Sequence, residues 1–246
     1  MSDAGGESGP GPTAEKSGPD PVSDLLEAAP ETAYFWGRVA GDGELTWKTI
    51  TVRADDERAA KALAAIAGTD RAEHRVAARE SAHDASIVRY EDEYELQVFG
   101  PTAERASAAL GLPLKDQSGG YRFDAFSEYR PQLVRGLLEA CGTVCFRESS
   151  GSVGISFVHS DERLLETVRS LLAAADPQVP TDELAETSSG GYYFGLAEGA
   201  DTAGFAEWVY AGSDRSGLYS EDRRNKLRRS VERATGGEVG ALSGER

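Results

Sequence analysis

Two runs of the chain, residues 34–43 and 133–142, share one pattern but differ at the position before their last glycine. That position is Asp42 in the first run and Cys141 in the second. A carboxylate is charged at neutral pH and is a hard oxygen ligand. A thiol with an ordinary pKa near about 8.5 is softer and mostly neutral. The chain therefore carries an acid at only one of two matched positions.

Each run predicts a short helix with a glycine at its centre, Gly37 in the first and Gly136 in the second. Because glycine has no side chain, two such helices can pack with their backbones close together. Helices that cross at these glycines bring their C-terminal ends side by side. We therefore expect Asp42 and Cys141 to be neighbours at the floor of a joint surface.

The segments after the two runs follow the same order, which predicts an internal repeat. In the first half, Ile50 and Val52 alternate with polar residues as in a half-buried strand, and an alanine-rich helix begins at Asp55. Each half is expected to read α-β-β-α-β-β-α, so the fold class is α+β with pseudo-two-fold symmetry. The expected elements after the glycine helices are 44–54, 55–67, 73–79, 86–99, 101–111, 143–148, 152–159, 161–172, 191–196 and 201–210.

Composition divides the chain into two repeats and two tails. Residues 1–24 are rich in Gly, Pro, Ser and acids, with too little apolar surface to order, and residues 235–246 are also expected to be flexible. The first repeat is placed at 25–115 and the second at 125–234. Neither tail is expected to carry the function.

The net charge of −16 and the scarcity of lysine are informative about partners. Lysine occurs only at positions 16, 48, 61, 115 and 226, and arginine supplies the remaining cations. An acidic excess with little lysine and abundant Ala and Gly is typical of a salt-in halophile such as a haloarchaeon, where molar salt screens self-repulsion. The alternative is an acidic mesophilic protein that avoids polyanions. Only the first interpretation leaves DNA open as a ligand.

The lengths of the apolar runs, the N-terminal residues, the cysteines and the histidines indicate where the protein works and which metal sites to expect. No run approaches the roughly 18 apolar residues of a membrane span, and no leader segment is evident at the N-terminus, so we expect a cytoplasmic protein without a membrane partner. The thiols of Cys141 and Cys145 are expected to be reduced. The three histidines are scattered, so a zinc site is not predicted.

The glycine helices and the elements after them resemble the LAGLIDADG homing endonuclease family. The motif aligns with residues 35–43 in the first copy and 134–142 in the second. A further likeness lies in the aromatic segment 205–210, in Leu218-Tyr219 and in the basic helix 223–233. The resemblance covers roughly residues 31–234 and implies a saddle of two sheets along duplex DNA, formed by one chain as a monomeric pseudo-dimer.

The resemblance also implies a metal-dependent reaction. In the family each helix end supplies a carboxylate to divalent metal ions, here Mg²⁺, which activate water for phosphodiester hydrolysis. Asp42 would be a catalytic metal ligand, and Cys141 departs from the motif. Glu139, two residues earlier, should point away from Asp42 on a helix and is a poor substitute. We therefore expect cleavage to be lost or slow while DNA binding persists.

Candidate DNA contacts fall into two groups of residues. One group is small polar and basic residues on the outward face of strands, and the other is the only dense basic cluster, whose spacing wraps most of a helix. The alternatives are ordinary exposed strand positions, and a solvated helix with Glu221, Asp222 and Glu232 as partners. The candidates are Thr49, Thr51, Arg53, Ser152, Ser156, Arg223, Arg224, Lys226, Arg228 and Arg229.

Three functions remain open from the sequence. The first is a LAGLIDADG-type double-stranded DNA-binding protein with impaired cleavage, of the kind adopted for regulation. The second is an active Mg²⁺-dependent, site-specific endonuclease that tolerates Cys141. The third is a pseudo-symmetric interaction protein without nucleic acid, which the acidity favours.

Overall fold

The computed structural model describes residues 19, 22–69, 72–81, 84–188 and 190–236. Nearly all of the expected tail at 1–24 and most of the expected tail at 235–246 lie outside these residues. The elements of the first half are α1 (Pro30–Asp42), β1 (Glu44–Leu45), β2 (Thr49–Ala54), α2 (Glu57–Ala67), β3 (Ala72–Ser81), β4 (Asp84–Phe99) and α3 (Thr102–Leu110).

The second half follows in the same order and then extends further. A 3-10 helix, η1 (Asp124–Tyr129), leads into α4 (Arg130–Cys141), which starts the second repeat. The remaining elements are β5 (Gly142–Arg147), β6 (Ser152–His159), α5 (Glu162–Ala173), β7 (Ala185–Glu186), β8 (Tyr192–Gly195), α6 (Thr202–Val209), α7 (Ser213–Ser216) and α8 (Glu221–Ala234).

Each half builds one four-stranded antiparallel sheet with the same connectivity. The strand order is β1-β2-β4-β3 in the first sheet and β5-β6-β8-β7 in the second. Within each half, the second and fourth strands pair at the centre although a helix separates them in the chain. The α+β fold with a tandem α-β-β-α-β-β-α repeat is therefore confirmed.

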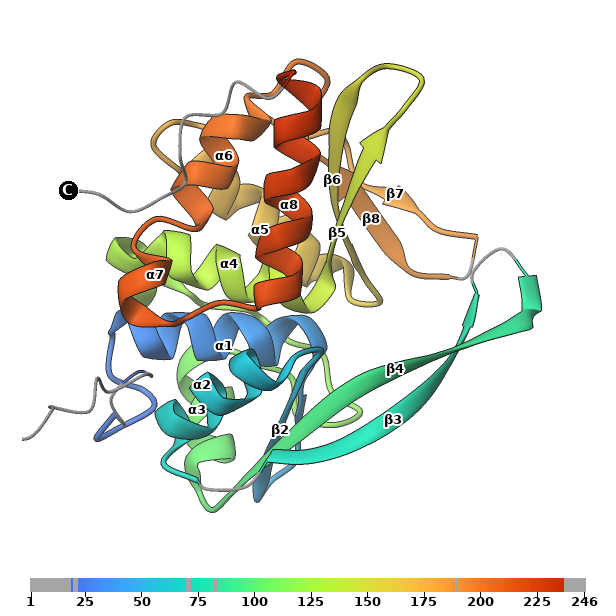
Figure 1. Ribbon diagram of the computed structural model, residues 1–246. Coiled ribbons are helices and arrows are strands. Elements are labelled where there is room, and N and C mark those ends of the chain that lie inside the picture. Colours follow the sequence, from blue (N-terminus) through green and yellow to red (C-terminus); the bar gives the residue numbers. More distant parts are fainter. Residues whose placement is uncertain (1–18, 20–21, 70–71, 82–83, 189, 237–246) are drawn as a thin grey trace, which may run out of the picture.

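The two glycine helices lie side by side at the centre of the molecule, with one sheet beyond each of them (Figure 1). Every residue of α1 from Thr32 to Gly41 is buried. Helices α2 and α3 cover the first sheet, and α5 and α8 cover the second. A single hydrophobic core runs through both halves, so the repeats form one packed unit rather than two separate domains.

Alternating burial shows which face of each sheet meets the helices. In β2, Ile50 and Val52 are buried while Thr49, Thr51 and Arg53 are partly exposed. In β6, burial of Val153, Ile155 and Phe157 leaves Ser152 and Ser156 partly exposed. This period of two is what a strand with one face on the core requires.

Local capping explains where several helices begin. The side chain of Asp56 accepts a hydrogen bond from the backbone N–H of Ala59 at the start of α2, and Asp161 does so from Arg163 at the start of α5. Ser220 has the same role at α8. Within the described residues, no helix combines the length and the apolar character that a membrane crossing requires.

Candidate functional site: the ends of the glycine helices

The α1–α4 contact depends on the absence of two side chains. A Cβ atom on Gly37 would lie 2.3 Å from the carbonyl oxygen of Leu133, and one on Gly136 would lie 2.4 Å from that of Tyr34. Both distances are far below van der Waals contact and involve backbone atoms of the opposite helix. The backbones therefore touch at these two glycines, and this contact fixes where the helices cross.

The crossing places the last residues of both helices close together. Asp42 ends α1 and is exposed, and Cys141 ends α4 and is half-buried. A Cβ on Gly41 would lie 3.3 Å from the Cys141 Sγ, so the thiol rests against the last turn of α1. The thiol donates a hydrogen bond to the Leu137 carbonyl oxygen at 3.3 Å.

The thiol at this position is held in its neutral form. Burial, and then the negative charge of Asp42, raise the pKa of Cys141 to about 12, which Arg38 and Arg223 only partly offset. At neutral pH the pair thus offers one carboxylate and one S–H group. Cys141 and Cys145 are both free thiols.

This donor set does not fit Mg²⁺. Magnesium prefers an octahedral shell of hard oxygen ligands and is commonly held by carboxylates and water. Among the described residues, no group of three or more His, Cys, Asp and Glu side chains is arranged to hold a metal ion. Cys141 contributes a neutral, soft thiol instead of the second carboxylate.

Glu139 is turned into the helix interface. Its side chain is buried and accepts a hydrogen bond of 2.7 Å from the hydroxyl of Tyr34. Arg38 Nη1 lies 3.7 Å from the same carboxylate oxygen. Burial raises the pKa of Glu139 although Arg38 and Tyr34 favour its charged form. These contacts commit its carboxylate to α1, and Glu139 also lines the same cavity as Asp42.

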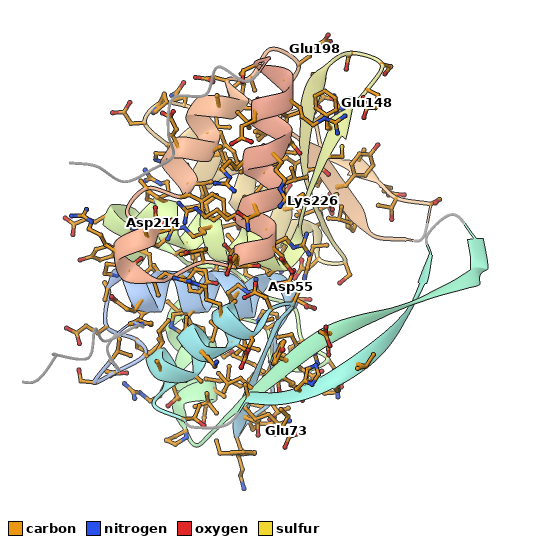
Figure 2. All side chains as sticks on the ribbon, viewed as in Figure 1. Asp55, Glu73, Glu148, Glu198, Asp214 and Lys226 are labelled. Atoms are coloured by element: carbon orange, nitrogen blue, oxygen red, sulfur yellow. The ribbon has the colours of Figure 1, made fainter. Side chains whose placement is uncertain are left out.

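Two further arginines surround the Asp42 end of α1. Arg53 donates to the Asp42 carbonyl oxygen at 3.2 Å, and Arg223 donates to the Gly142 carbonyl oxygen at 3.0 Å. Arg223 also forms an ion pair with Asp55 at 2.8 Å. These side chains line a polar cavity of about 320 Å³ beside the helix ends. Figure 2 shows Asp55 at this junction, where α8 approaches α1.

The candidate DNA contacts on the first sheet share one solvent-facing surface, but Arg53 is engaged there. Its Nε lies 3.3 Å from Glu95 and 3.8 Å from Glu93, both on β4. Thr49 and Thr51 are on the same face of β2 as Arg53. On the second sheet, Ser152 and Ser156 lie on the corresponding face of β6.

The basic helix α8 divides into inward and outward residues. Arg223 reaches Asp55, and Arg224 forms an ion pair with Asp214 and lies over the ring of Tyr219. Arg228 pairs with Glu232 on its own helix, at 3.8 Å between Nε and Oε1. Lys226 and Arg229 are exposed, and the described part of the chain holds no ion pair to either. The cluster thus has both internal structural contacts and free surface charge.

Three buried charged groups at the helix pair were not singled out by sequence reasoning. They are Arg38, Glu139 as a partner of Tyr34, and Arg135, whose guanidinium donates to the carbonyl oxygens of Val209, Ala211 and Leu218 at 2.7 to 2.9 Å. Arg135 thereby ties α6 and α7 to α4. The sequence did offer one indication of their burial, because all three charged residues lie inside the glycine-centred runs 34–43 and 133–142.

Comparison with known proteins agrees with this architecture. A LAGLIDADG family model described as "Putative archaeal homing endonuclease" matches residues 12–237. Among solved structures, the homing endonuclease I-WcaI bound to its DNA recognition sequence has a TM-score of 0.52 at 8% identity, with 84% of this chain and 88% of that chain covered. No curated protein matches the chain.

Two other solved structures are similar at lower TM-scores. Full-length DUF199/WhiA from Thermatoga maritima gives 0.49 at 10% identity, covering 90% of this chain and 64% of that one, so the chain spans less than two thirds of that protein. I-DmoI in complex with DNA and Mn gives 0.42 at 14% identity, covering 78% and 98%. Since the family model spans nearly the whole chain, the protein belongs to the LAGLIDADG homing endonuclease-like family that this model describes.

Proposed function

We propose that this protein binds double-stranded DNA in the manner of LAGLIDADG homing endonucleases, with cleavage impaired because Cys141 stands in place of the second metal-binding acid. The observation that carries the proposal is the juxtaposition of Asp42 and Cys141 at the ends of the paired glycine helices. The scaffold that would position two carboxylates is complete, whereas the donor set is not.

DNA binding is supported by the family and by the geometry of the two sheets. Both sheets expose one face away from the helices. On that face, the partly exposed residues of β2 and β6 are Thr49, Thr51, Arg53, Ser152 and Ser156, small and polar apart from Arg53, and Val158 is exposed beside them. Small polar side chains suit shape-led contact with a duplex better than a dense code of base contacts. Lys226, Arg228 and Arg229 supply exposed cations for the phosphate backbone.

The family function would require Mg²⁺, and this chain could offer it the Asp42 carboxylate. The bound ions would supply Lewis acidity and an activated water. A neutral thiol at Cys141 supplies neither a negative charge nor a hard ligand. We therefore propose that cleavage is impaired because Mg²⁺ binding is weakened, and not because of a later step of the reaction.

The cleavage test is to restore the missing acid. Purified wild type, Cys141→Asp, Cys141→Ser and the double variant Cys141→Asp/Asp42→Asn are incubated with supercoiled plasmid and Mg²⁺ at molar KCl. We expect nicking or linearisation to rise at least about tenfold only in Cys141→Asp, because the thiol-to-hydroxyl control adds no carboxylate. Vigorous cleavage by the wild type would overturn the impairment and favour an active Mg²⁺-dependent endonuclease.

Binding is tested separately from cleavage. Duplex DNA is titrated with wild type and with Arg228→Glu/Arg229→Glu across a range of KCl concentrations. We expect wild-type affinity to fall with salt through counterion release and to be lost in the charge-reversed variant. Absence of binding at every salt concentration would refute DNA binding.

A pseudo-symmetric interaction protein is the second candidate function. The net charge of −16 and the glutamates on the first sheet favour it. The scarcity of lysine is compatible with both functions if the protein works at molar salt in the cytoplasm of a halophilic archaeon, which we propose as its setting.

A further inference from the structure

Large hydrophobic side chains are exposed at five positions of the described chain, and most of these positions belong to the solvent-facing surfaces of the two sheets. The five side chains are 42% to 73% exposed: Trp47, Val76, Phe99, Val158 and Tyr193. Phe99 lies opposite Thr49, and Val158 lies opposite Tyr193, so these side chains point away from the helices. Trp47 lies in the turn that leads into β2.

Trp47 and Phe99 lie at the same end of the first sheet. The backbone N–H of Gly100 donates to the Lys48 carbonyl oxygen at 2.9 Å, and these two residues directly follow Phe99 and Trp47. The hydroxyl oxygen of Thr46 accepts a hydrogen bond from the Lys48 N–H at 3.4 Å, which closes the turn. Both rings are therefore carried by hydrogen-bonded backbone, so a ligand that covers them does not have to order a loose segment.

Val158 and Tyr193 form an apolar pair on the second sheet. They are register partners across β6 and β8, and each side chain is 42% exposed. Cross-strand partners have their Cβ atoms about 5 Å apart, so the two side chains make one continuous apolar surface. The next residue on the same face of β6 is Ser156, which is too small to cover the pair.

The two apolar pairs occupy different positions within the repeat. Thr51 and Ser156 are matched positions, because each pairs with the second residue after a glycine helix. Phe99 lies opposite the residue two before Thr51, whereas Val158 comes two after Ser156. Later residues of these strands lie closer to the helix ends, as the hydrogen bond from Arg53 to the last residue of α1 shows. The pair on the second sheet is therefore nearer the helix ends, by about 13 Å along the strand.

Duplex DNA offers an apolar group that fits such small contacts. The major groove admits a two-stranded β-ribbon, such as β2–β4 or β6–β8, and each thymine presents its 5-methyl group there. A stable protein interface buries about 800 Å² on each partner, which is far more than two side chains supply. An apolar contact is also not screened by ions, so it keeps its strength at molar salt, where phosphate contacts weaken.

We infer that one thymine is read in each half of the bound duplex, by Trp47 and Phe99 on the first sheet and by Val158 and Tyr193 on the second. The 5-methyl group of each thymine packs against the exposed apolar side chains. The thymine read by the first sheet lies farther from the centre of the site than the thymine read by the second. This inference rests on the proposed DNA binding by both sheets.

The experiment removes single methyl groups from the DNA. A binding sequence is selected with the full chain from a random duplex library of about 30 base pairs. Each of its thymines is then replaced singly by deoxyuridine, which lacks only the 5-methyl group, and affinity is measured against KCl for wild type, Phe99→Ser and Val158→Ser. Val76→Ser is the matched control, because Val76 is 59% exposed on the opposite face of the first sheet. All three positions are exposed, so folding should be retained, and circular dichroism checks this.

The expected result is one sensitive thymine in each half of the site, at unequal distances from its centre. Deoxyuridine at either position should weaken wild-type binding about three- to fourfold, the effect of removing one buried methyl group. Phe99→Ser should abolish this sensitivity in one half only and Val158→Ser in the other half only, while Val76→Ser keeps both. Neither variant should change the slope of affinity against KCl, because no charge is removed.

Three results would overturn thymine reading. They are a selected site without thymine in either half, deoxyuridine effects that persist in Phe99→Ser and Val158→Ser, and a wild-type dimer that dissociates in Phe99→Ser with unchanged DNA affinity. Sedimentation measures the last of these, which would mean that a second copy of the chain covers the first pair. A wild type that binds no duplex would instead overturn the proposed function, and this inference with it.

Discussion

The hydroxyl of Tyr34 on α1 donates a hydrogen bond of 2.7 Å to the Glu139 carboxylate on α4, so a buried polar contact joins the two repeats. Arg38 approaches the same oxygen from α1 at 3.7 Å. Both Arg38 and Glu139 are at most 2% exposed. Buried charges of this kind depend on their partners, because an uncompensated charge in the core is strongly destabilising.

Replacing Tyr34 by Phe should therefore destabilise the whole molecule. The change removes the donor to Glu139 and leaves a buried carboxylate with one fewer partner, so the free energy of unfolding should fall by about 1 to 3 kcal/mol. Urea denaturation at fixed pH and KCl measures it. Tyr193→Phe, at an exposed tyrosine, is the control and should change stability by less than about 0.5 kcal/mol. Equal effects of the two substitutions would contradict the role of the contact.

Gly136→Ala tests the backbone contact between the glycine helices. The added Cβ would meet the Tyr34 carbonyl oxygen at 2.4 Å, and neither helix can shift without moving its sheet. We expect a loss of about 3 kcal/mol or more in unfolding free energy, measured by denaturation. Gly120→Ala is the matched control, because its nearest neighbour would lie 4.0 Å away at the flexible end of Arg122. A fully stable Gly136→Ala protein would show that the helices can separate.

The repeat and most elements could be predicted from the sequence because they depend on local pattern. Alternation located β2 and β6, and the helices expected at 55–67 and 161–172 correspond to α2 and α5. The two-residue strand β7 was not located, since two residues carry no period. The connecting helices η1 and α7 were also missed, because they are short and set by tertiary contacts.

The polar contacts of the site could not be predicted, because they depend on which distant elements meet. Arg53 is a predicted DNA contact, and the sequence did not indicate that the register of β2 on β4 places it opposite Glu95. Arg38 and Arg135 are at most 2% exposed although charged residues are usually exposed. Sequence pattern places a residue on a face, whereas its partner comes from the packing of the other half.

His159 should make stability depend on pH near neutrality. Burial lowers the pKa of His159, and this effect is larger than the opposite effect of the Asp161 and Asp42 carboxylates. The His159 Nδ1 accepts a hydrogen bond from the Asp161 backbone N–H at 2.9 Å. The folded state therefore prefers the neutral ring. Its stabilising contribution is present above the ordinary pKa of about 6.5 and is lost as the pH falls below that value.

The corresponding measurement compares wild type with His159→Asn from about pH 7 to about pH 5. Asparagine keeps an acceptor for the Asp161 N–H but does not titrate. We expect the wild type to lose more unfolding free energy over this interval than the variant. Parallel pH profiles would mean that the His159 ring titrates alike in the folded and unfolded chains.

Salt should stabilise the protein well beyond ordinary screening. With a net charge of −16, the folded state concentrates acidic side chains, and KCl shields their repulsion. Thermal unfolding from about 0.1 to 3 M KCl should show a rise in Tm of about 10 °C or more. Sucrose, an uncharged stabiliser, serves as a control for solvent exclusion. A Tm that does not change with the KCl concentration would favour the alternative of an acidic mesophilic protein.

The buried Arg38–Glu139 pair between α1 and α4 also makes the two repeats different from each other. At the shared motif positions, Arg38 corresponds to Leu137 and Glu139 corresponds to Ala40. Two copies of the first repeat would leave each Arg38 without its Glu139 partner, and two copies of the second would leave each Glu139 without Arg38 and Tyr34. Each repeat is therefore complementary to the other and not to itself. In one chain, each repeat keeps the partner that completes this buried pair.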